Sequence, residues 1–324
     1  MPHIKVMPGL PKPIERALRG AVFEYSVARK KFLERFAGKF DHEFSVTDLM
    51  QAPKQLWLRR QFREDIVIDL VRDNYFSLLG SVVHHILEKY APPSCIVEER
   101  QHTLMEVDGY KILLHGQPDL YDPDGEQLDD YKFVSAFAVL YEKAEYEFQL
   151  NVGKYLFETR GIPVKGLRNI YLFRHLDKIA QMRNPDYPRE NIFIKVHQPW
   201  TRSVTESKIR SLISNLVKYS KFPWKQLPDC TDAERWIRES SWAVMKRKKG
   251  TKKQPIQDWG KLAFARFDTE KEARDFIGNS NEVEEMKIEK RIGEPKKCME
   301  YCPVVPWCQQ RQAELNLKPQ TLND

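Results

Sequence analysis

Residues 96–134 carry the pattern that most restricts how this chain can fold. Three strand-like runs follow one another here, and they read IVEERQHTLMEV, YKILLHGQPDLYD and EQLDDYKFV. The first two are separated by Asp108-Gly109 and the last two by DPDG, and Asp-Gly steps between such runs are hairpin signals. The pattern predicts a meander of antiparallel strands in the middle of the chain.

Helical segments flank this meander on both sides. Residues 62–90 and 137–160 place apolar side chains at helical spacing, and a Gly-Ile-Pro step at 161–163 ends the second segment. Two further strand-like runs, RNIYLF and NIFIKV, precede a predicted helix at 204–221, and mixed short elements fill the last hundred residues. This order predicts an α/β or α+β domain with a small appended module.

Composition excludes several broad classes of protein. Hydrophobic residues make up 41% and charged residues 31% of the chain, a globular balance rather than that of a disordered chain. No window approaches 18 uninterrupted apolar residues, so no membrane span is expected. The first residues carry prolines and charges where a signal peptide needs an apolar run, so we expect a cytoplasmic location, in a bacterial cell or phage-infected host. The net charge of +7 favours an acidic partner such as nucleic acid, although ordinary soluble proteins also reach it.

Two aspartates and a lysine within the meander form the strongest chemical signal. Asp119 follows a glycine on one strand, and Asp130 and Lys132 lie two residues apart on the next. Residues i and i+2 of a strand share a face, and the intervening hairpin would bring Asp119 next to Asp130. Paired carboxylates bind hard divalent cations such as Mg²⁺ or Mn²⁺, and a neighbouring lysine can orient water or neutralise developing phosphate charge.

This pattern of Asp, then Asp-x-Lys, resembles the PD-(D/E)XK nuclease superfamily, and further motifs resemble its RecB-like exonuclease branch. LGSVVHHILE is similar to the histidine motif of that branch, and EFQLNVGKYLFE is similar to its glutamine motif. VTDLMQAPKQLWLRR resembles the segment that leads into the core. PDCTDAERW together with CMEYCPVVPWC resembles the four-cysteine tail of a group found often in phages. The resemblance covers roughly residues 44–310.

The resemblance implies a restriction-endonuclease-like core, a mixed central sheet flanked by helices. It divides the chain into an N-terminal helical extension (1–43), a nuclease core (44–225), a C-terminal module with a basic hairpin and a cysteine cluster (226–312), and a flexible tail (313–324). The implied function is a Mg²⁺- or Mn²⁺-dependent DNA exonuclease that acts at DNA ends or on single strands, in phage or bacterial recombination and end processing.

The resemblance also assigns roles to individual residues. The metal ligands would be His84, Asp119, Asp130 and the backbone carbonyl of Tyr131. Lys132 would position the attacking water, and Gln149 would hold DNA or the lysine. On residue pattern alone, His84 can equally be a packed core histidine, Gln149 a surface amide, and Glu98 part of an edge-strand charge pair with Glu99.

One position departs from the family pattern and motivates an alternative function. Position 153 is glycine, where the glutamine motif often carries an aromatic residue, and Tyr155 stands two positions later. The alternative is a DNA-binding or assembly protein that keeps the nuclease fold without turnover. No phosphate-binding-loop motif of an ATPase is present, so any unwinding would come from a partner such as a helicase, and a recombinase or single-strand-binding protein is a further candidate partner. The resemblance leaves an oligomer open.

Two clusters near the C-terminus carry separate expectations. Three of the five cysteines fall within eleven residues, which in a reducing compartment indicates metal rather than disulfides. The resemblance implies a [4Fe–4S] cluster, with Zn²⁺ or unligated thiols as alternatives, held by Cys230, Cys298, Cys302 and Cys308. A basic loop would contact phosphate, unless it is simply a solvated loop, through Lys246, Arg247, Lys248, Lys249, Lys252 and Lys253.

Overall fold

The computed structural model describes residues 3–141, 144–237, 240–247, 259, 263–279 and 286–317, without the side chains of 21–26 and 74. The chain divides into two compact units, Met1–Leu227 and Pro228–Asp324. Each unit is described by itself. No helix in the described part of the chain is both long enough and apolar enough to cross a membrane.

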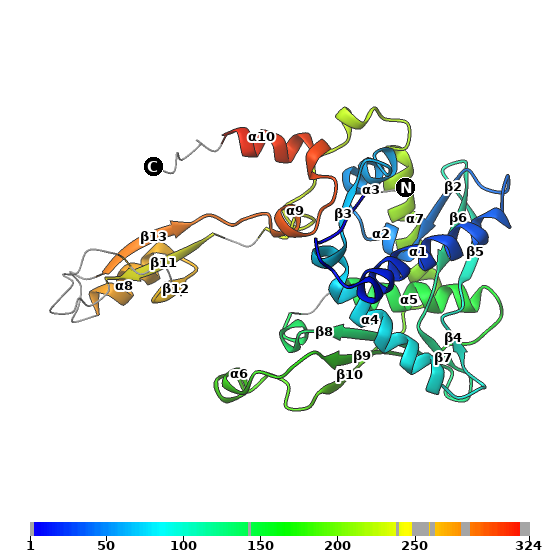
Figure 1. Cartoon of the computed structure of the whole chain (residues 1–324), viewed down its shortest axis with the longest axis horizontal. Coiled ribbons are helices and arrows are strands. Elements are labelled where there is room, and N and C mark those ends of the chain that lie inside the picture. The colour runs from blue at the N-terminus through cyan, green and yellow to red at the C-terminus, as the bar shows by residue number, and fades with distance from the viewer. Residues whose placement is uncertain are drawn as a thin grey trace. The chain divides into compact units, whose positions relative to one another are not determined.

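The first unit is a mixed α/β structure built on a five-stranded mixed sheet (Figure 1). The strand order is β10-β9-β8-β7-β4, in which β8 and β9 run parallel and the other neighbours run antiparallel. The strands of this sheet are β4 (Ile96–Val97), β7 (Leu120–Asp122), β8 (Gln127–Val134), β9 (Gly166–Phe173) and β10 (Ile192–His197).

Two smaller sheets complete the strands of the first unit. One is the two-stranded parallel pair of β1 (His3–Lys5) and β3 (Val67–Asp69). The other has the order β2-β6-β5 and contains β2 (His42–Ser45), β5 (Gln101–Val107) and β6 (Tyr110–Gly116). The predicted hairpin at Asp108-Gly109 is confirmed: both residues have positive φ, 53° and 78°, and Val107 pairs with Tyr110.

Helices cover these sheets, and two of them matter for the site. Helix α4 and helix α5 both pack against β8, and α5 also packs against α7. The helices of the first unit are α1 (Lys12–Glu34), α2 (Val46–Leu49), α3 (Pro53–Gln61), α4 (Leu70–Tyr90), α5 (Ala144–Glu158), α6 (Lys178–Arg183) and α7 (Arg202–Lys218), with short 3-10 turns η1 (Ala136–Val139) and η2 (Trp224–Gln226).

The helix predicted over 62–90 is correct only from Leu70 onward. Residues Val67–Asp69 instead form β3, because their backbone pairs with β1. The side chain of Asp69 then accepts hydrogen bonds from the backbone N–H groups of Val71 (3.2 Å) and Arg72 (3.1 Å), so it caps the start of α4. Pairing with a distant segment therefore overrides the local helical pattern at this end.

Close packing explains the glycine that departs from the family pattern. Gly153 lies on α5, where a Cβ atom would come within 3.0 Å of Leu128 Cδ2 and 3.6 Å of Pro118 Cγ. The helix thus lies close to β8 and to the segment that carries Asp119. An aromatic side chain would not fit at this position without moving the helix.

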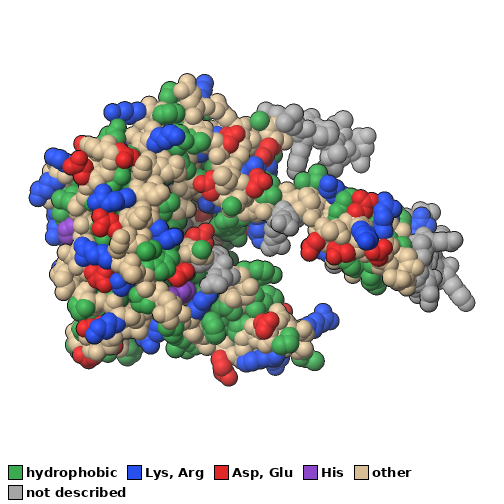
Figure 2. Space-filling model, turned by 180° about the vertical axis from the view of Figure 1, so that it is seen from behind, with side chains coloured by type: hydrophobic (Ala, Val, Ile, Leu, Met, Phe, Trp, Pro, Cys, Tyr) green, Lys and Arg blue, Asp and Glu red, His purple; other side chains and the backbone are tan. Residues whose placement is uncertain are grey.

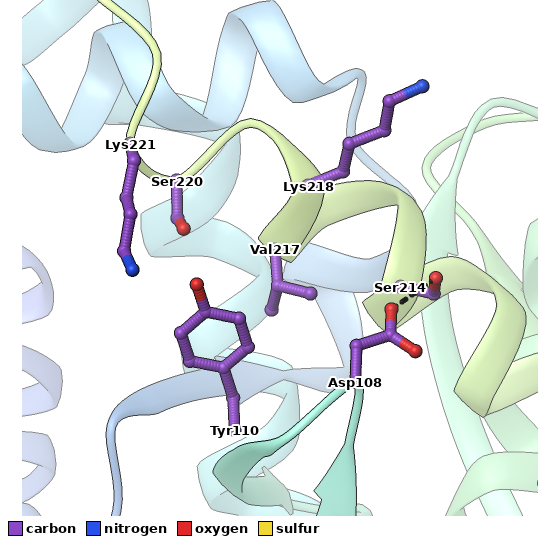
Figure 3. A pocket seen from close by; sticks show the side chains of 7 residues that line it. All are labelled: Asp108, Tyr110, Ser214, Val217, Lys218, Ser220 and Lys221. Atoms are coloured by element: carbon purple, nitrogen blue, oxygen red, sulfur yellow. Dashed lines mark hydrogen bonds between the residues drawn. The ribbon is translucent and has the colours of Figure 1, made fainter.

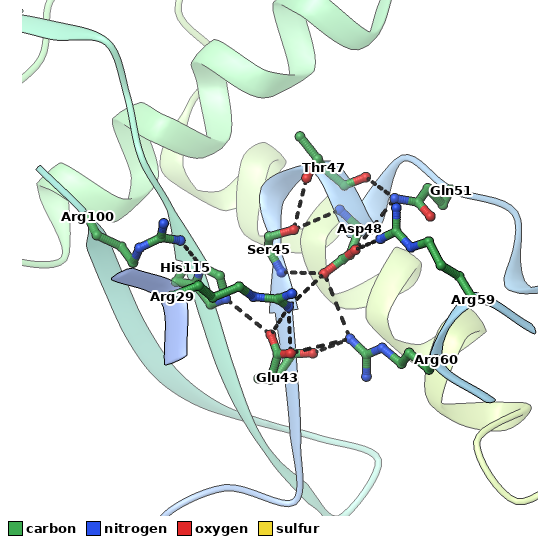
Figure 4. Close-up of polar contacts among 10 residues, drawn as sticks. All are labelled: Arg29, Glu43, Ser45, Thr47, Asp48, Gln51, Arg59, Arg60, Arg100 and His115. Atoms are coloured by element: carbon green, nitrogen blue, oxygen red, sulfur yellow. Dashed lines mark hydrogen bonds and ion pairs between the residues drawn. The ribbon is translucent and has the colours of Figure 1, made fainter. Parts of the chain in front are cut away.

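A partly buried ion-pair network joins α1, β2, α2, α3 and β6 (Figure 4). Arg29 Nη2 lies 2.6 Å from Glu43 Oε1, and Arg59 Nη2 lies 2.9 Å from Asp48 Oδ1. His115 Nε2 lies 3.1 Å from Glu43 Oε2. Because an arginine can only donate, and Arg100 contacts Nδ1 of His115 at 3.1 Å, the neutral imidazole carries its proton on Nε2 and donates it to Glu43.

Glu43 is expected to stabilise the fold mainly above its unfolded-state pKa. Burial opposes its charge, but the hydrogen bond from His115 and the charge of Arg29 outweigh burial and lower its pKa from 4.5 to about 2. The resulting stabilisation, about 3 kcal/mol, is present above pH 4.5 and is lost as the pH falls toward 2. Glu43→Gln should therefore lower the free energy of unfolding at neutral pH, and the difference from wild type should shrink in acid. Denaturant unfolding at several pH values measures this, with the exposed Glu34→Gln as control; a difference that does not depend on pH would contradict it.

The second unit has its own small sheet, of order β12-β11-β13, with one helix packed against it. Residues 313–317, expected to belong to a flexible tail, instead continue α10, and residues beyond 317 lie outside the described part. The elements are β11 (Ser241–Lys246), β12 (Ala265–Phe267), α8 (Glu270–Gly278), β13 (Met286–Arg291), α9 (Lys296–Glu300), the 3-10 turn η4 (Val305–Trp307) and α10 (Gln309–Leu317).

Charged side chains on one face of the first unit are interspersed rather than segregated. On the face shown in Figure 2, lysines and arginines alternate with acidic side chains. The net charge of +7 therefore does not form one continuous positive field on this face. On this face, recognition of an anion would come from local groups of arginine and lysine.

Candidate metal centre

Helix α4 brings His84 to the sheet beside two carboxylates. His84 Nδ1 lies 3.0 Å from Glu98 Oε1 and 3.6 Å from Asp119 Oδ1. The hydrogen bond to Glu98 outweighs burial and raises the pKa of His84, and the charge of Asp119 adds to the effect. His84 thus lies within reach of Asp119, and its role as a metal ligand stays a prediction.

Asp119 immediately precedes β7 and faces the middle of β8. Pairing of Leu120 with Asp129 sets this register, and the backbone N–H of Tyr131 donates to Asp119 Oδ2 at 2.6 Å. The side chain is buried, and burial together with the charge of Asp130 raises the pKa of Asp119 to about 7. The ionised form of a carboxylate that is buried beside another carboxylate is strongly stabilised by a nearby cation.

Asp130 and Lys132 share one face of β8, as their spacing predicts. Lys132 Nζ lies 2.6 Å from Asp130 Oδ2 and 3.3 Å from Gln149 Oε1, which comes from α5. Burial opposes its charge, but Asp130 and Asp119 outweigh burial and raise the pKa of Lys132. The lysine is therefore held charged between its own strand and α5.

The neighbouring strands fix Asp130 from its other side. Asn169 on β9 stands opposite Asp130 in the parallel register and donates to Asp130 Oδ2 at 2.7 Å. His197 Nε2 on β10 lies 2.7 Å from Asn169 Oδ1. Both supporting side chains are buried, and neither was indicated by the sequence motifs.

Glu98 is the site residue that sequence reasoning missed. In the described part of the chain, one potential metal-binding group has ligand atoms all within 4.8 Å of one another, and it consists of His84, Glu98 and Asp119. The two glutamates were expected as neighbouring charges on an edge strand, but β4 ends at Val97, Glu98 contacts His84 and Glu99 lies 2.9 Å from Arg160. The sequence feature that could have pointed to Glu98 is the short apolar run Ile96–Val97. This run forms β4, and its pairing with β7 places Glu98 beside Asp119.

The backbone and a neighbouring amide hold Glu98 in position. Its φ is 49°, a left-handed conformation that is uncommon outside glycine, and its N–H donates to the Asp119 carbonyl at 3.1 Å. Gln117 Nε2 donates to Glu98 Oε2 at 2.8 Å. Two carboxylates and an imidazole, held in this way, are an oxygen-rich donor set that suits Mg²⁺ or Mn²⁺.

Asp130 and the Tyr131 backbone, both predicted as ligands, have other contacts. The Asp130 oxygens engage Lys132 and Asn169, and Asp130 is not a member of the group within 4.8 Å. Tyr131 takes part through its N–H group, and its ring lies edge-on to His84 with 6.2 Å between centroids. The ligand roles of Asp130 and of the Tyr131 carbonyl stay predictions.

The four predicted cluster cysteines all belong to the second unit. Gln310 exchanges two hydrogen bonds with the Cys230 backbone, both 2.9 Å, and so ties that segment to α10. Burial, then Glu234 and the three other cysteines of the cluster raise the pKa of Cys230 to about 12. The four thiols are thus neighbours, yet among the described residues no three of them have sulfurs within 4.8 Å of one another.

Only the start of the predicted basic loop is described. Lys246 ends β11, and Arg247 forms an isolated bridge with Trp259, its guanidinium 5.2 Å from the indole ring. Lys248, Lys249, Lys252 and Lys253 lie outside the described residues. Phosphate contact by this loop stays a prediction.

Two cavities lie away from the metal centre. The first, of about 290 Å³, lies between the β5–β6 turn and the end of α7 and is lined by Asp108, Tyr110, Ser214, Val217, Lys218, Ser220 and Lys221 (Figure 3). None of the predicted site residues lines it. The second, of about 330 Å³, is rich in arginine and is lined by Phe32, Arg35, Glu99, Arg100, His102 and Arg160.

Comparison with known proteins gives structural neighbours but no family. No protein-family model matches the chain, and no curated protein sequence matches it. The solved structure of SSO0001 is similar at 15% identity and a TM-score of 0.43, over 64% of this chain and 87% of that chain. A phage-related exonuclease from Haemophilus somnus 129PT is similar at 13% identity and a TM-score of 0.33, over 54% of this chain and 81% of that chain.

Proposed function

We propose that this protein is a Mg²⁺- or Mn²⁺-dependent DNA exonuclease with a PD-(D/E)XK core of the RecB-like type. The observation that carries the proposal is the convergence of His84, Glu98 and Asp119 on one point, beside a charged Lys132. These three residues come from separate elements, and the motifs that resemble the nuclease branch contribute two of them together with the lysine.

The donor set fits a divalent ion, which His84, Glu98 and Asp119 would hold. When bound, such an ion supplies Lewis-acid stabilisation of negative charge on a phosphoryl oxygen. Lys132 orients the attacking water and stabilises the charge that develops at phosphorus. Asp130 and Gln149 fix the Nζ position of Lys132, while Asn169 keeps Asp130 from turning away.

The supporting shell makes this arrangement suited to catalysis. Asp119 and Asp130 are buried and cannot relax to solvent, so their charges stay directed at the metal position and at Lys132. We propose DNA ends or single strands as the substrate, in phage or bacterial recombination and end processing. Since the sequence lacks an ATPase phosphate-binding loop, strand opening would fall to a partner such as a helicase.

End-labelled DNA tests the proposed function. Single- and double-stranded DNA carrying a label at the 5′ or the 3′ end is incubated with Mg²⁺ or Mn²⁺. Stepwise release of mononucleotides from one end is the expected result. Internal fragments from both labels would show that the protein is an endonuclease. Salt-sensitive DNA binding without cleavage would instead support the DNA-binding alternative.

We also propose that Cys230, Cys298, Cys302 and Cys308 hold a [4Fe–4S] cluster. Cys298, Cys302 and Cys308 lie close enough to Cys230 to raise its pKa, which supports one metal group shared by the four thiols, and the resemblance of the tail favours an iron–sulfur cluster. We expect brown protein in which iron and acid-labile sulfide are equimolar, and Cys298→Ser protein that loses both, while Cys95→Ser protein retains them. Stoichiometric zinc without iron would contradict the cluster.

A further inference from the structure

One face of the three-stranded sheet in the second unit gathers cationic side chains. In an antiparallel pair, residues that stand directly opposite each other point to the same side of the sheet. On one side, β11 contributes Ser241, Ala243 and Met245, and their partners are Arg266 on β12 and Arg291, Glu289 and Lys287 on β13. Arg247 alternates onto the same side and forms its bridge with Trp259. We call this side the basic face.

Helix α8 covers the opposite side of the sheet. Phe267 on β12 stands opposite Trp242, whose position alternates with those of the basic face, and the Phe267 ring lies 5.1 Å from the ring of Phe276 on α8. Figure 1 shows α8 beside β11 and β12. The helix therefore leaves the basic face uncovered, and the side chains of Arg247, Arg266 and Lys287 are exposed.

Carboxylates do not neutralise the positive charge of this face. On its described strand positions, Glu289 is the one carboxylate against four cations. Asp268 follows β12 beyond the paired residues, and positive charge dominates even when it is included. Among the described residues, the ion pairs of this unit join other side chains, such as Arg274 with Glu270 on α8.

Contacts within the basic face position its cations without cancelling their charge. The Arg247 guanidinium and the Lys287 ammonium lie 5.2 Å and 4.9 Å from the centroid of the Trp259 ring. Arg291 Nη2 lies 3.6 Å from Met245 Sδ. An aromatic ring and a thioether carry no net charge, so the face keeps a local excess of positive charge.

We propose that the basic face binds the phosphodiester backbone of a nucleic-acid strand. Such a strand presents its negative charges one at a time along its length. The cations of the face are likewise spread out, since side chains on one side of a strand repeat every 6.6 Å or so and neighbouring strands lie about 4.8 Å apart. Three of the four cations are arginines, which bind phosphate oxygens through bidentate, charge-assisted hydrogen bonds.

The same face is less suited to an anionic membrane. Protein surfaces that bind membranes combine cations with exposed apolar side chains, which enter the lipid. The apolar residues that β11 places on the basic face, Ala243 and Met245, are instead buried. An acidic protein is a further class of polyanion, and the experiment below separates it from nucleic acid.

Strand binding by the basic face does not require the proposed nuclease activity; only its use in holding a DNA substrate rests on that function. Binding is therefore measured on the full-length chain in EDTA, where cleavage plays no part. Asp119→Asn protein should bind as wild type under these conditions. Failure of the basic face and failure of the nuclease assignment thus give different results.

Fluorescence anisotropy of a labelled single-stranded oligonucleotide, and of the duplex of the same sequence, tests the proposal at several salt concentrations. The double variant Arg266→Gln and Lys287→Gln removes two exposed cations of the face. It should bind single-stranded DNA about tenfold more weakly than wild type, and the slope of log affinity against log salt should become shallower by about 1.4. A matching loss with the duplex would extend the site to double strands.

The matched control is the double variant Lys271→Gln and Arg274→Gln. Both residues are exposed cations on α8, so this variant lowers the net charge of the chain by the same amount without touching the basic face. It should bind DNA as wild type does. Polyglutamate at equal charge concentration should compete poorly with the oligonucleotide.

Three results would overturn the proposal. The first is wild-type DNA affinity in the variant of Arg266 and Lys287. The second is an equal loss of affinity in the α8 control, which would reduce the effect to net charge. The third is competition by polyglutamate as strong as that by unlabelled DNA, which would assign the face to acidic proteins.

Discussion

Asp119→Asn protein should cleave DNA about 1,000-fold more slowly than wild type at saturating Mg²⁺, because it loses a charge at the centre of the metal site. The carboxylate is buried, and its pKa is raised to about 7 by burial and by Asp130, so a bound cation relieves an existing electrostatic penalty. The amide keeps the size and the hydrogen bond from Tyr131 but not the charge. Initial cleavage rates and calorimetric Mg²⁺ titration of the same samples measure both consequences.

Two further variants separate this effect from a general loss of charge. Glu98→Gln should also weaken Mg²⁺ binding, since Glu98 belongs to the same group of ligand atoms. Asp124→Asn makes the same chemical change as Asp119→Asn at an exposed turn position and should behave as wild type. Wild-type Mg²⁺ affinity in both Asp119→Asn and Glu98→Gln would remove the basis for a metal centre at this place.

Lys132→Met should reduce cleavage about 1,000-fold while it leaves Mg²⁺ binding nearly unchanged. The lysine contacts Asp130 and Gln149 rather than the group formed by His84, Glu98 and Asp119, so its charge acts on water and phosphate. Cleavage rates and calorimetry on one preparation give the two values.

The matched control is Lys165→Met, which removes a lysine that is paired with Glu126 at the surface. It should cleave at the wild-type rate. Cleavage by Lys132→Met at the wild-type rate would exclude Lys132 as the residue that orients water.

Local signals in the sequence predicted much of the site because its central part lies on consecutive strands. The hairpin after Asp119 and the alternation along β8 were enough to place Asp119, Asp130 and Lys132 together. The predicted turn at Asp108-Gly109 formed because both positions adopt positive φ, which Asp-Gly tolerates.

The residues that sequence reasoning missed depend on contacts between distant segments. Glu98 reaches the site only because a two-residue strand, β4, pairs with β7. Asn169 and His197 support Asp130 through the register of β8, β9 and β10, and no local pattern reveals that register. A contact between distant segments also explains why Val67–Asp69 is a strand and not part of the predicted helix. These residues form β3 because they pair with β1, although the segment has helical periodicity.

DNA degradation by wild-type protein as a function of Mg²⁺ concentration, measured after EDTA treatment and with Asp119→Asn alongside, tests the central claim most directly. We predict no degradation without metal, saturable degradation with Mg²⁺ or Mn²⁺, and almost none in the variant. Wild-type protein that binds DNA yet leaves it intact in both metals, or a variant as active as wild type, would contradict a nuclease centred on His84, Glu98 and Asp119.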